Sequence, residues 1–170
     1  MRAALLLGSC LFGLALCGCV GYRLGPTNGQ VAGSRSIQIN PFQNETLEPR
    51  LVEPVTSALR KNIQRDGTYR LNTRNEGEII VNGLITNYDR SGLSFNPRDI
   101  LTPRDFQVTL TAKISAIERS TGKTILDREV LGRTTLRTSG DLGSAERQAI
   151  PQLADDLAKN VTSLLVDGTW

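Results

Sequence analysis

Few side chains in this sequence have the chemistry that catalysis requires, because its 170 residues include no histidine. That absence excludes Ser-His-Asp and Cys-His catalysis, His-ligated metal sites and histidine-based pH switches. The one pair of adjacent acids, Asp155-Asp156, falls in a predicted helix, where neighbouring side chains point about 100° apart and so face different directions. Gly122-Lys123-Thr124 resembles the end of a phosphate-binding loop, but it lacks the earlier glycine and the following helix. We therefore expect no enzyme activity, no cofactor and no metal site.

The chain begins with the pattern of a secreted lipoprotein. A basic residue precedes the apolar run 3–16, which is shorter than the roughly 20 apolar residues of a membrane-spanning helix. The run ends in Leu16-Cys17-Gly18-Cys19, which resembles the bacterial lipobox. Cys17 is a competing acceptor and a plain secretory signal is a further interpretation, but the large residue before Cys17 favours Cys19. We expect residues 1–18 to be a signal peptide and Cys19 to carry acyl chains, such as palmitate, that anchor the protein.

The mature chain that this cleavage would leave has no cysteine beyond the acylated one, so it can form no disulfide and no thiolate metal site. Val20 follows Cys19 in place of an aspartate, which argues against retention in the inner membrane. Hydrophobic residues make up 39% of the sequence and charged residues 22%, which is typical of a folded domain. Basic and acidic residues are mixed along the chain and only 5% of residues are aromatic, so we expect no nucleic-acid partner.

The mature chain divides into a tether and one domain. Residues 19–34 are rich in glycine and polar residues and predict a lipidated tether, and residues 35–170 predict a single α+β domain. Alternation and helical spacing predict a β-α-β-β-β-β-α order, with strands at 36–40, 69–71, 78–89, 106–117 and 126–136 and helices at about 49–66 and 144–166. Pro54 and Pro151 are expected to kink these helices or to mark where their regular parts begin.

The strand predicted at 106–117 has the clearest pattern in the sequence. Apolar residues alternate strictly with polar ones from Phe106 to Ala116, which predicts one buried and one solvated face. In the strand before it, Ile80, Leu84 and Tyr88 are assigned to one face and their odd-numbered apolar neighbours to the other. These patterns predict a two-layer α/β sandwich, with a mostly antiparallel or mixed sheet covered on one face by two amphipathic helices.

The segment 89–105 is expected to be a long loop between two strands, and loops of this length in small domains are often functional. It mixes the apolar residues Leu93, Phe95 and Ile100 with Arg98 and Arg104. Such a mixture suits contact with an amphiphilic anion or with the wall of a partner protein. The alternative is a flexible surface loop whose arginines pair with the neighbouring aspartates. Arg137, on the outer face of the following strand, could extend the basic surface.

Several motifs together give the chain a resemblance to a known family. They are the start Cys19-x-Gly-Tyr-x-Leu, the segment Asn44-x-Thr-x-Glu-Pro49 running into a helix, the two long strands and the closing helix with Leu157-Ala158. On these residues the chain resembles the LptE-type lipopolysaccharide-assembly lipoproteins. The resemblance implies a lipid-anchored α/β protein at the periplasmic face of the outer membrane, which plugs an LptD-type β-barrel and assists lipopolysaccharide transport and insertion into the outer leaflet.

The same resemblance suggests roles for the long segment. We carry lipopolysaccharide binding onto Arg98, Arg104 and Arg137, and barrel contact onto the three apolar residues named above. The alternative function is a periplasm-facing lipoprotein that binds and activates a cell-wall synthase. A carboxylate-dependent hydrolase is a third class, which would need a cleft around a pair of acids.

Overall fold

The computed structural model describes residues 31–96, 99–137 and 141–167, and for residues 95–96 and 99–102 it describes the backbone alone. Cys19, the tether and Arg98 therefore lie outside the described residues. The described elements are, in chain order, β1 (Arg35–Ile39), β2 (Gln43–Asn44), α2 (Val52–Asp66), β3 (Tyr69–Leu71), β4 (Ile79–Asn96), β5 (Asp99–Glu118), β6 (Thr124–Arg137) and α3 (Leu142–Asp167). No helix in these ranges is long and apolar enough to cross a membrane.

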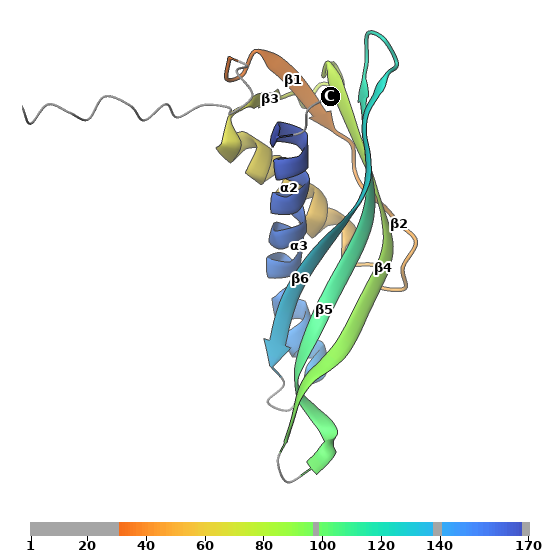
Figure 1. The fold of residues 1–170 in the computed structure, drawn as a ribbon, viewed down its shortest axis with the longest axis vertical. Coiled ribbons are helices and arrows are strands. Elements are labelled where there is room, and N and C mark those ends of the chain that lie inside the picture. The colour runs from red at the N-terminus through yellow and green to blue at the C-terminus, as the bar shows by residue number, and fades with distance from the viewer. Residues whose placement is uncertain (1–30, 97–98, 138–140, 168–170) are drawn as a thin grey trace, which may run out of the picture.

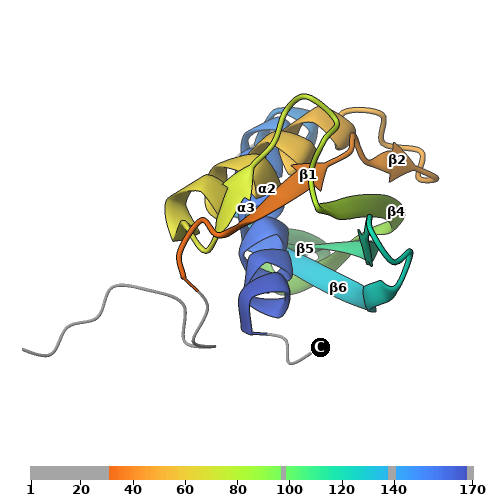
Figure 2. The same cartoon turned by 90° about the horizontal axis from the view of Figure 1, so that it is seen from above.

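The strands form one mixed sheet of six strands in the order β3-β1-β4-β5-β6, with β2 pairing beside β1 on the same edge of β4. β1, β2 and β3 join it in parallel, whereas β4, β5 and β6 form a long antiparallel meander. Both helices pack against one face of this sheet (Figure 1), and the view from above separates the two layers (Figure 2). The expected two-layer α+β sandwich is confirmed.

The apolar residues that alternate along the longest strand form the centre of the core. Val108, Leu110, Ala112, Ile114 and Ala116 are all buried against the helices. The intervening side chains lie on the open face of the sheet and are mostly half-exposed. This is the division that period-2 alternation dictates when one face of a sheet is covered.

One face assignment was wrong, and a β-bulge is the reason. The ladder pairs Ile85 with Ala112 and Asn87 with Thr111, so Thr86 is an extra residue in β4. A bulge shifts the alternation by one position, which moves Tyr88 to the helix-covered face. There it lies opposite Leu110 and packs partly buried against the core.

The helices follow their sequence signals, with two differences at their starts. α2 begins at Val52 instead of near Pro49, and Pro54 lies in its first turn, where the missing N–H costs no hydrogen bond. Its end is set by Gly67, whose φ of 76° is in the left-handed region. α3 begins at Leu142 instead of near Ser144, and it continues through Pro151 as one helix.

α3 lies very close to β6 at Gly132. A Cβ placed on this glycine would sit 2.7 Å from the Leu157 Cβ and 2.9 Å from the Leu153 carbonyl oxygen. Only a residue without a side chain allows this approach. The contact fixes α3 beside the edge strand of the sheet.

The prediction of a long loop at 89–105 was wrong. β4 continues to Asn96 and β5 begins at Asp99, so almost the whole segment is paired in an extended β-hairpin. Bulges and turn-forming residues interrupt the alternation here, which is why the sequence pattern indicated a loop.

Candidate functional site

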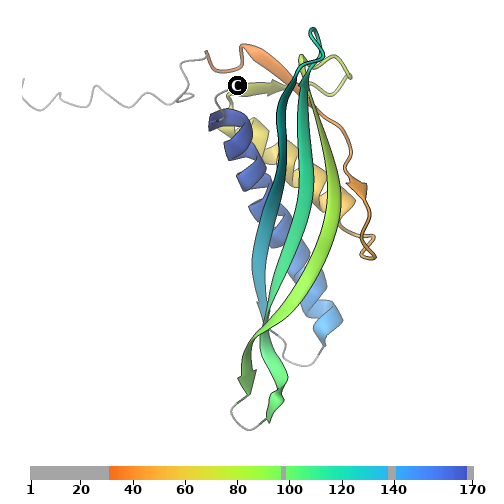
Figure 3. The same cartoon turned by 45° about the vertical axis from the view of Figure 1, so that its right-hand side comes forward.

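The extended hairpin of β4 and β5 reaches one end of an elongated molecule. β1 begins and α3 finishes at the opposite end (Figures 1 and 3). We call residues 89–105 the distal hairpin. Its register is irregular: Leu93 is an extra residue opposite the pairs of Gly92 and Ser94, and Arg104 is an extra residue on the facing strand. Bulges of this kind re-aim side chains near functional surfaces.

One polar row joins three strands across the distal hairpin. Arg137 of β6 donates from Nε to Asp105 of β5 at 2.7 Å, and the Ser94 hydroxyl of β4 donates to the other carboxylate oxygen at 2.5 Å. The Arg137 hydrogen bond holds the pKa of the Asp105 carboxyl below its usual range, and the Ser94 bond lowers it further. Arg137 therefore has a structural partner, yet 68% of its side chain remains exposed to an external anion.

The other predicted basic residues are placed less simply. Arg104 is exposed, and its charge contributes to the low pKa of Asp105, so it lies near the same row. Arg98 is outside the described residues. Arg90 does not join them, because it forms an ion pair with Glu146 of α3 and lies over the Phe106 ring, 5.6 Å from its centre.

The apolar residues predicted for partner contact are described only in part. Leu93 is 50% exposed at its bulge. The backbone of Phe95 pairs with that of Pro103, and Ile100 has no register partner, but the side chains of Phe95 and Ile100 are outside the described part.

A feature that the sequence analysis treated only as a motif is the turn between β2 and α2. The Asn44 carboxamide oxygen accepts the Thr46 N–H at 3.0 Å and its hydroxyl at 2.8 Å, while the Asn44 amide donates to the Glu48 carbonyl at 2.8 Å. The turn that these bonds fix presents Leu47 fully exposed to solvent. Beside it lies a groove of about 480 Å³, which we call the β4 groove, lined by Glu45–Glu48, Thr86–Tyr88, Arg90 and Glu146.

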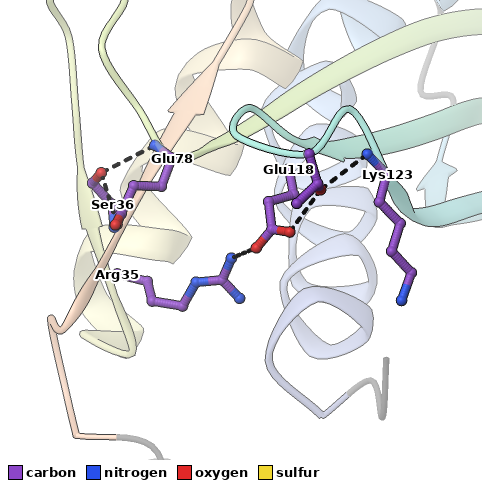
Figure 4. A network of polar contacts seen from close by, with 6 residues as sticks. Arg35, Ser36, Glu78, Glu118 and Lys123 are labelled. Carbon is purple, nitrogen blue, oxygen red and sulfur yellow. Dashed lines mark hydrogen bonds and ion pairs between the residues drawn. The ribbon is translucent and has the colours of Figure 1, made fainter.

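The end of the molecule opposite the distal hairpin is held by a second polar network (Figure 4). Glu78 accepts the Ser36 N–H at 2.6 Å and its hydroxyl at 3.2 Å. Arg35 forms an ion pair with Glu118 at 2.6 Å. The Ser36 N–H is the main reason that the pKa of the Glu78 carboxyl is lowered. These contacts fix the start of β1, where the domain meets the segment before it.

The acid pair 155–156 is split between two structural roles. Asp155 accepts the Asn62 amide at 3.0 Å and forms an ion pair with Lys159 at 2.9 Å. Asp156 instead accepts the backbone N–H of Arg133 at 2.8 Å. The two carboxylates therefore have different partners on different elements. Gly122-Lys123 lies in the tight turn between β5 and β6, with Gly122 at a φ of 68°.

Comparison with known proteins identifies a family. The sequence model of the family described as "LptE: Lipopolysaccharide-assembly" matches residues 34–165, which is most of the chain. No curated protein sequence matches the chain.

Solved structures share the fold at low sequence identity. A protein from Xanthomonas campestris has a TM-score of 0.60 at 7% identity, covering 86% of this chain and 92% of its own. One from Chlamydia trachomatis gives 0.56 at 8%, covering 79% and 96%. A minor lipoprotein from Acinetobacter baumannii gives 0.52 at 14%, covering 78% and 93%.

Proposed function

The chain belongs to the LptE family of lipopolysaccharide-assembly proteins, and on this basis we propose that it is an outer-membrane lipoprotein that assembles with an LptD-type β-barrel and plugs it. In this role it has no enzymatic activity and assists the passage of lipopolysaccharide to the outer leaflet. The family match is the observation that carries the proposal.

The shape of the domain supports the proposal. An acyl anchor at Cys19 would connect through residues 20–34 to the start of β1, which lies at one end of the long axis. The distal hairpin then projects away from the membrane anchor by the length of the sheet. A narrow domain held at one end in this way is suited to enter the lumen of a wide barrel from the periplasmic side.

Lipopolysaccharide contact is assigned to the basic side chains of the distal hairpin and of the adjoining end of β6. Guanidinium groups bind phosphates through paired, charge-assisted hydrogen bonds. Arg104 of the hairpin and Arg137 of β6 are exposed, and Arg98 belongs to the segment 89–105. Leu93, together with Phe95 and Ile100, would supply the apolar contact with the barrel wall or with acyl chains.

Co-purification after mild detergent extraction tests the barrel partner directly. The proposal predicts that the lipidated chain brings the LptD-type barrel with it. Recovery of a cell-wall synthase and no barrel would overturn the proposal in favour of the alternative function.

The anchor has its own test. Cys19→Ala should abolish labelling by a fatty-acid analogue, because Cys19 is the proposed acyl acceptor. Labelling that persists and moves to Cys17 would overturn the assignment of the anchor, but not that of the barrel partner.

The lipid contact is tested by the triple variant Arg98→Glu/Arg104→Glu/Arg137→Glu, with Arg128→Glu on the opposite half of β6 as a control. The triple variant should lose salt-sensitive lipopolysaccharide binding, whereas the control should retain it. Thermal melting of both variants checks that the fold persists. Equal binding by the triple variant and the parent at low salt would overturn the role of these arginines.

A further inference from the structure

The outer edge of β4 changes character at Ile85. Up to this residue the edge is occupied, because Asn40 donates its backbone N–H to the Val81 carbonyl and Glu45 donates to the Ile85 carbonyl, both at 3.0 Å. β2 pairs there as a two-residue parallel strand. Beyond Ile85, β4 runs on to Asn96, and within the described ranges no strand pairs with it on that side.

The bulge at Thr86 determines which backbone groups face outward along this part of the edge. In an antiparallel ladder the outward-pointing residues alternate with those that bond the neighbouring strand. Val81 and Ile85 point outward before the bulge, and the extra residue shifts the phase by one. Tyr88, Arg90 and Gly92 therefore direct their N–H and C=O groups away from β5. A regular ladder spans Asn87 to Gly92, between this bulge and the next.

The β4 groove lies directly beside this open edge. Its wall on the far side is the turn that Asn44 holds rigid, with Leu47 fully exposed at its tip. An extended peptide could continue the line of β2 and fill the groove. Its side chains on one face would meet Leu47 and the partly buried ring of Tyr88.

The charges around the groove specify what such a peptide should carry. Glu45, Glu48 and Glu146 line it against the single guanidinium of Arg90, which is already paired with Glu146. Burial raises the pKa of the Tyr88 phenol, and the carboxylates of Glu146 and Glu48 raise it further, whereas Arg90 lowers it. An apolar strand with a lysine or arginine complements the groove.

We propose that the outer edge of β4 from Asn87 to Gly92 is a strand-addition site, which takes an extended, basic and apolar segment of the partner barrel protein. Main-chain hydrogen bonds to Tyr88, Arg90 and Gly92 supply register, and the β4 groove supplies side-chain selectivity. The assignment rests on the proposed function for the identity of the partner, and it names the surface of this chain that the partner uses.

The variant Arg90→Pro tests whether the outward backbone N–H of Arg90 donates a hydrogen bond to the partner. Arg90→Pro removes an outward N–H without removing a bond to β5, and edge strands tolerate proline at such positions. Arg90→Ala removes the same side chain but keeps the N–H. Binding of the purified barrel should fall at least tenfold further for Arg90→Pro than for Arg90→Ala, with melting temperatures of the two variants compared. Equal affinities for two folded variants would overturn the proposal.

Amide hydrogen exchange of the unmodified complex tests the site without any substitution that could disturb the fold. Exchange at Tyr88, Arg90 and Gly92 should slow at least tenfold when the barrel binds. A complex without this protection overturns the strand-addition site alone, whereas a chain that binds no barrel overturns the proposed function and this site with it. The same protection in a dimer of this chain without barrel would also overturn the proposal, because a second copy would then be the occupant.

Discussion

α3 caps the backbone at one long edge of the sheet, on β6, but leaves the backbone at the other, on β4, open. At the β6 edge, Asp156 accepts the Arg133 N–H at 2.8 Å and the Asn160 amide donates to the Leu131 carbonyl at 2.7 Å, both from α3. At the β4 edge beyond Ile85, Glu146 of α3 binds the Arg90 side chain, and among the described residues no side chain of α3 caps the backbone. Exposed strand edges pair with other chains unless they are covered. Of these two edges, the stretch of β4 beyond Ile85 is therefore the one whose backbone is open to an added strand.

The capping of the β6 edge depends on the close approach of α3 to β6. Side chains as short as aspartate and asparagine reach the edge backbone only because Gly132 lets the helix backbone come near. Gly132, Asp156 and Asn160 therefore act together to cap the β6 edge. No equivalent glycine brings a described helix against the outer edge of β4.

The largest effect is expected from the residue that lies between the two edges. Leu110 of β5 is fully buried, with Tyr88 and Gly132 as its partners on either side. Leu110→Asp would bury an unpaired carboxylate and should cost about 4 kcal/mol or more, enough to unfold a domain of ordinary stability. Thr109→Asp, on the open face, should cost less than about 1 kcal/mol. Urea unfolding of both variants measures the difference, and equal losses would mean that the two faces have been misassigned.

Gly132→Ala should push α3 away from the β6 edge that it caps. The added Cβ meets Leu157 and the Leu153 carbonyl at distances that real side chains do not adopt, so α3 must shift. We expect the free energy of unfolding to fall by about 1–3 kcal/mol, the usual cost of overpacking. Leu131→Ala, at a half-exposed neighbour, is the control and should cost less. A Gly132→Ala protein as stable as its parent would contradict the close packing.

Removing the caps should convert the closed edge into an open one. Asp156→Ala/Asn160→Ala loses two hydrogen bonds, each with a net contribution of about 1 kcal/mol, and frees the backbone of Arg133 and Leu131. We expect a modest loss of stability and concentration-dependent self-association, measured by analytical ultracentrifugation. Ser163→Ala, which removes an exposed hydroxyl that donates to Asp167, should remain monomeric. A monomeric double variant would show that these side chains do not protect the edge.

The smallest effect concerns the polar row at the distal hairpin, where Ser94, Asp105 and Arg137 join β4, β5 and β6. Because the folded pKa of Asp105 is lowered, its stabilising effect is present at neutral pH and is lost only as pH falls through that folded value. Arg137→Gln should raise this pKa toward the ordinary range, and Ser94→Ala should raise it less. Carboxyl NMR titration measures both shifts. An unchanged pKa in Arg137→Gln would show that the row does not form.

Much of the fold could be predicted because local patterns matched the final environment. The alternation from Phe106 to Ala116 survived because the extra residue opposite this stretch, Thr86, belongs to β4, so that β5 itself keeps its period of two. Where bulges occur the same rule failed, at Tyr88 and throughout the distal hairpin. A bulge is set by how two strands fit together, so it leaves no periodic signal in either strand.

The candidate site was predictable only in part, for a related reason. The apolar and basic composition of 89–105 indicated a functional segment, and Arg104 and Leu93 are exposed there. The edges were not foreseen, because Asp156 and Arg133 are 23 residues apart and the open edge of β4 is defined by where β2 ends. Long-range contacts of this kind have no signature in a single sequence.

Residue-resolved amide exchange across both edges, with and without the bound barrel, shows whether the barrel pairs with the open edge of β4. We predict that the Arg90 and Gly92 amides, which exchange freely in the isolated chain, become protected in the complex. The Arg133 amide, already bonded to Asp156, should be protected in both states and serves as the internal reference. Protection that appears along β6 while the β4 edge continues to exchange freely would contradict the account.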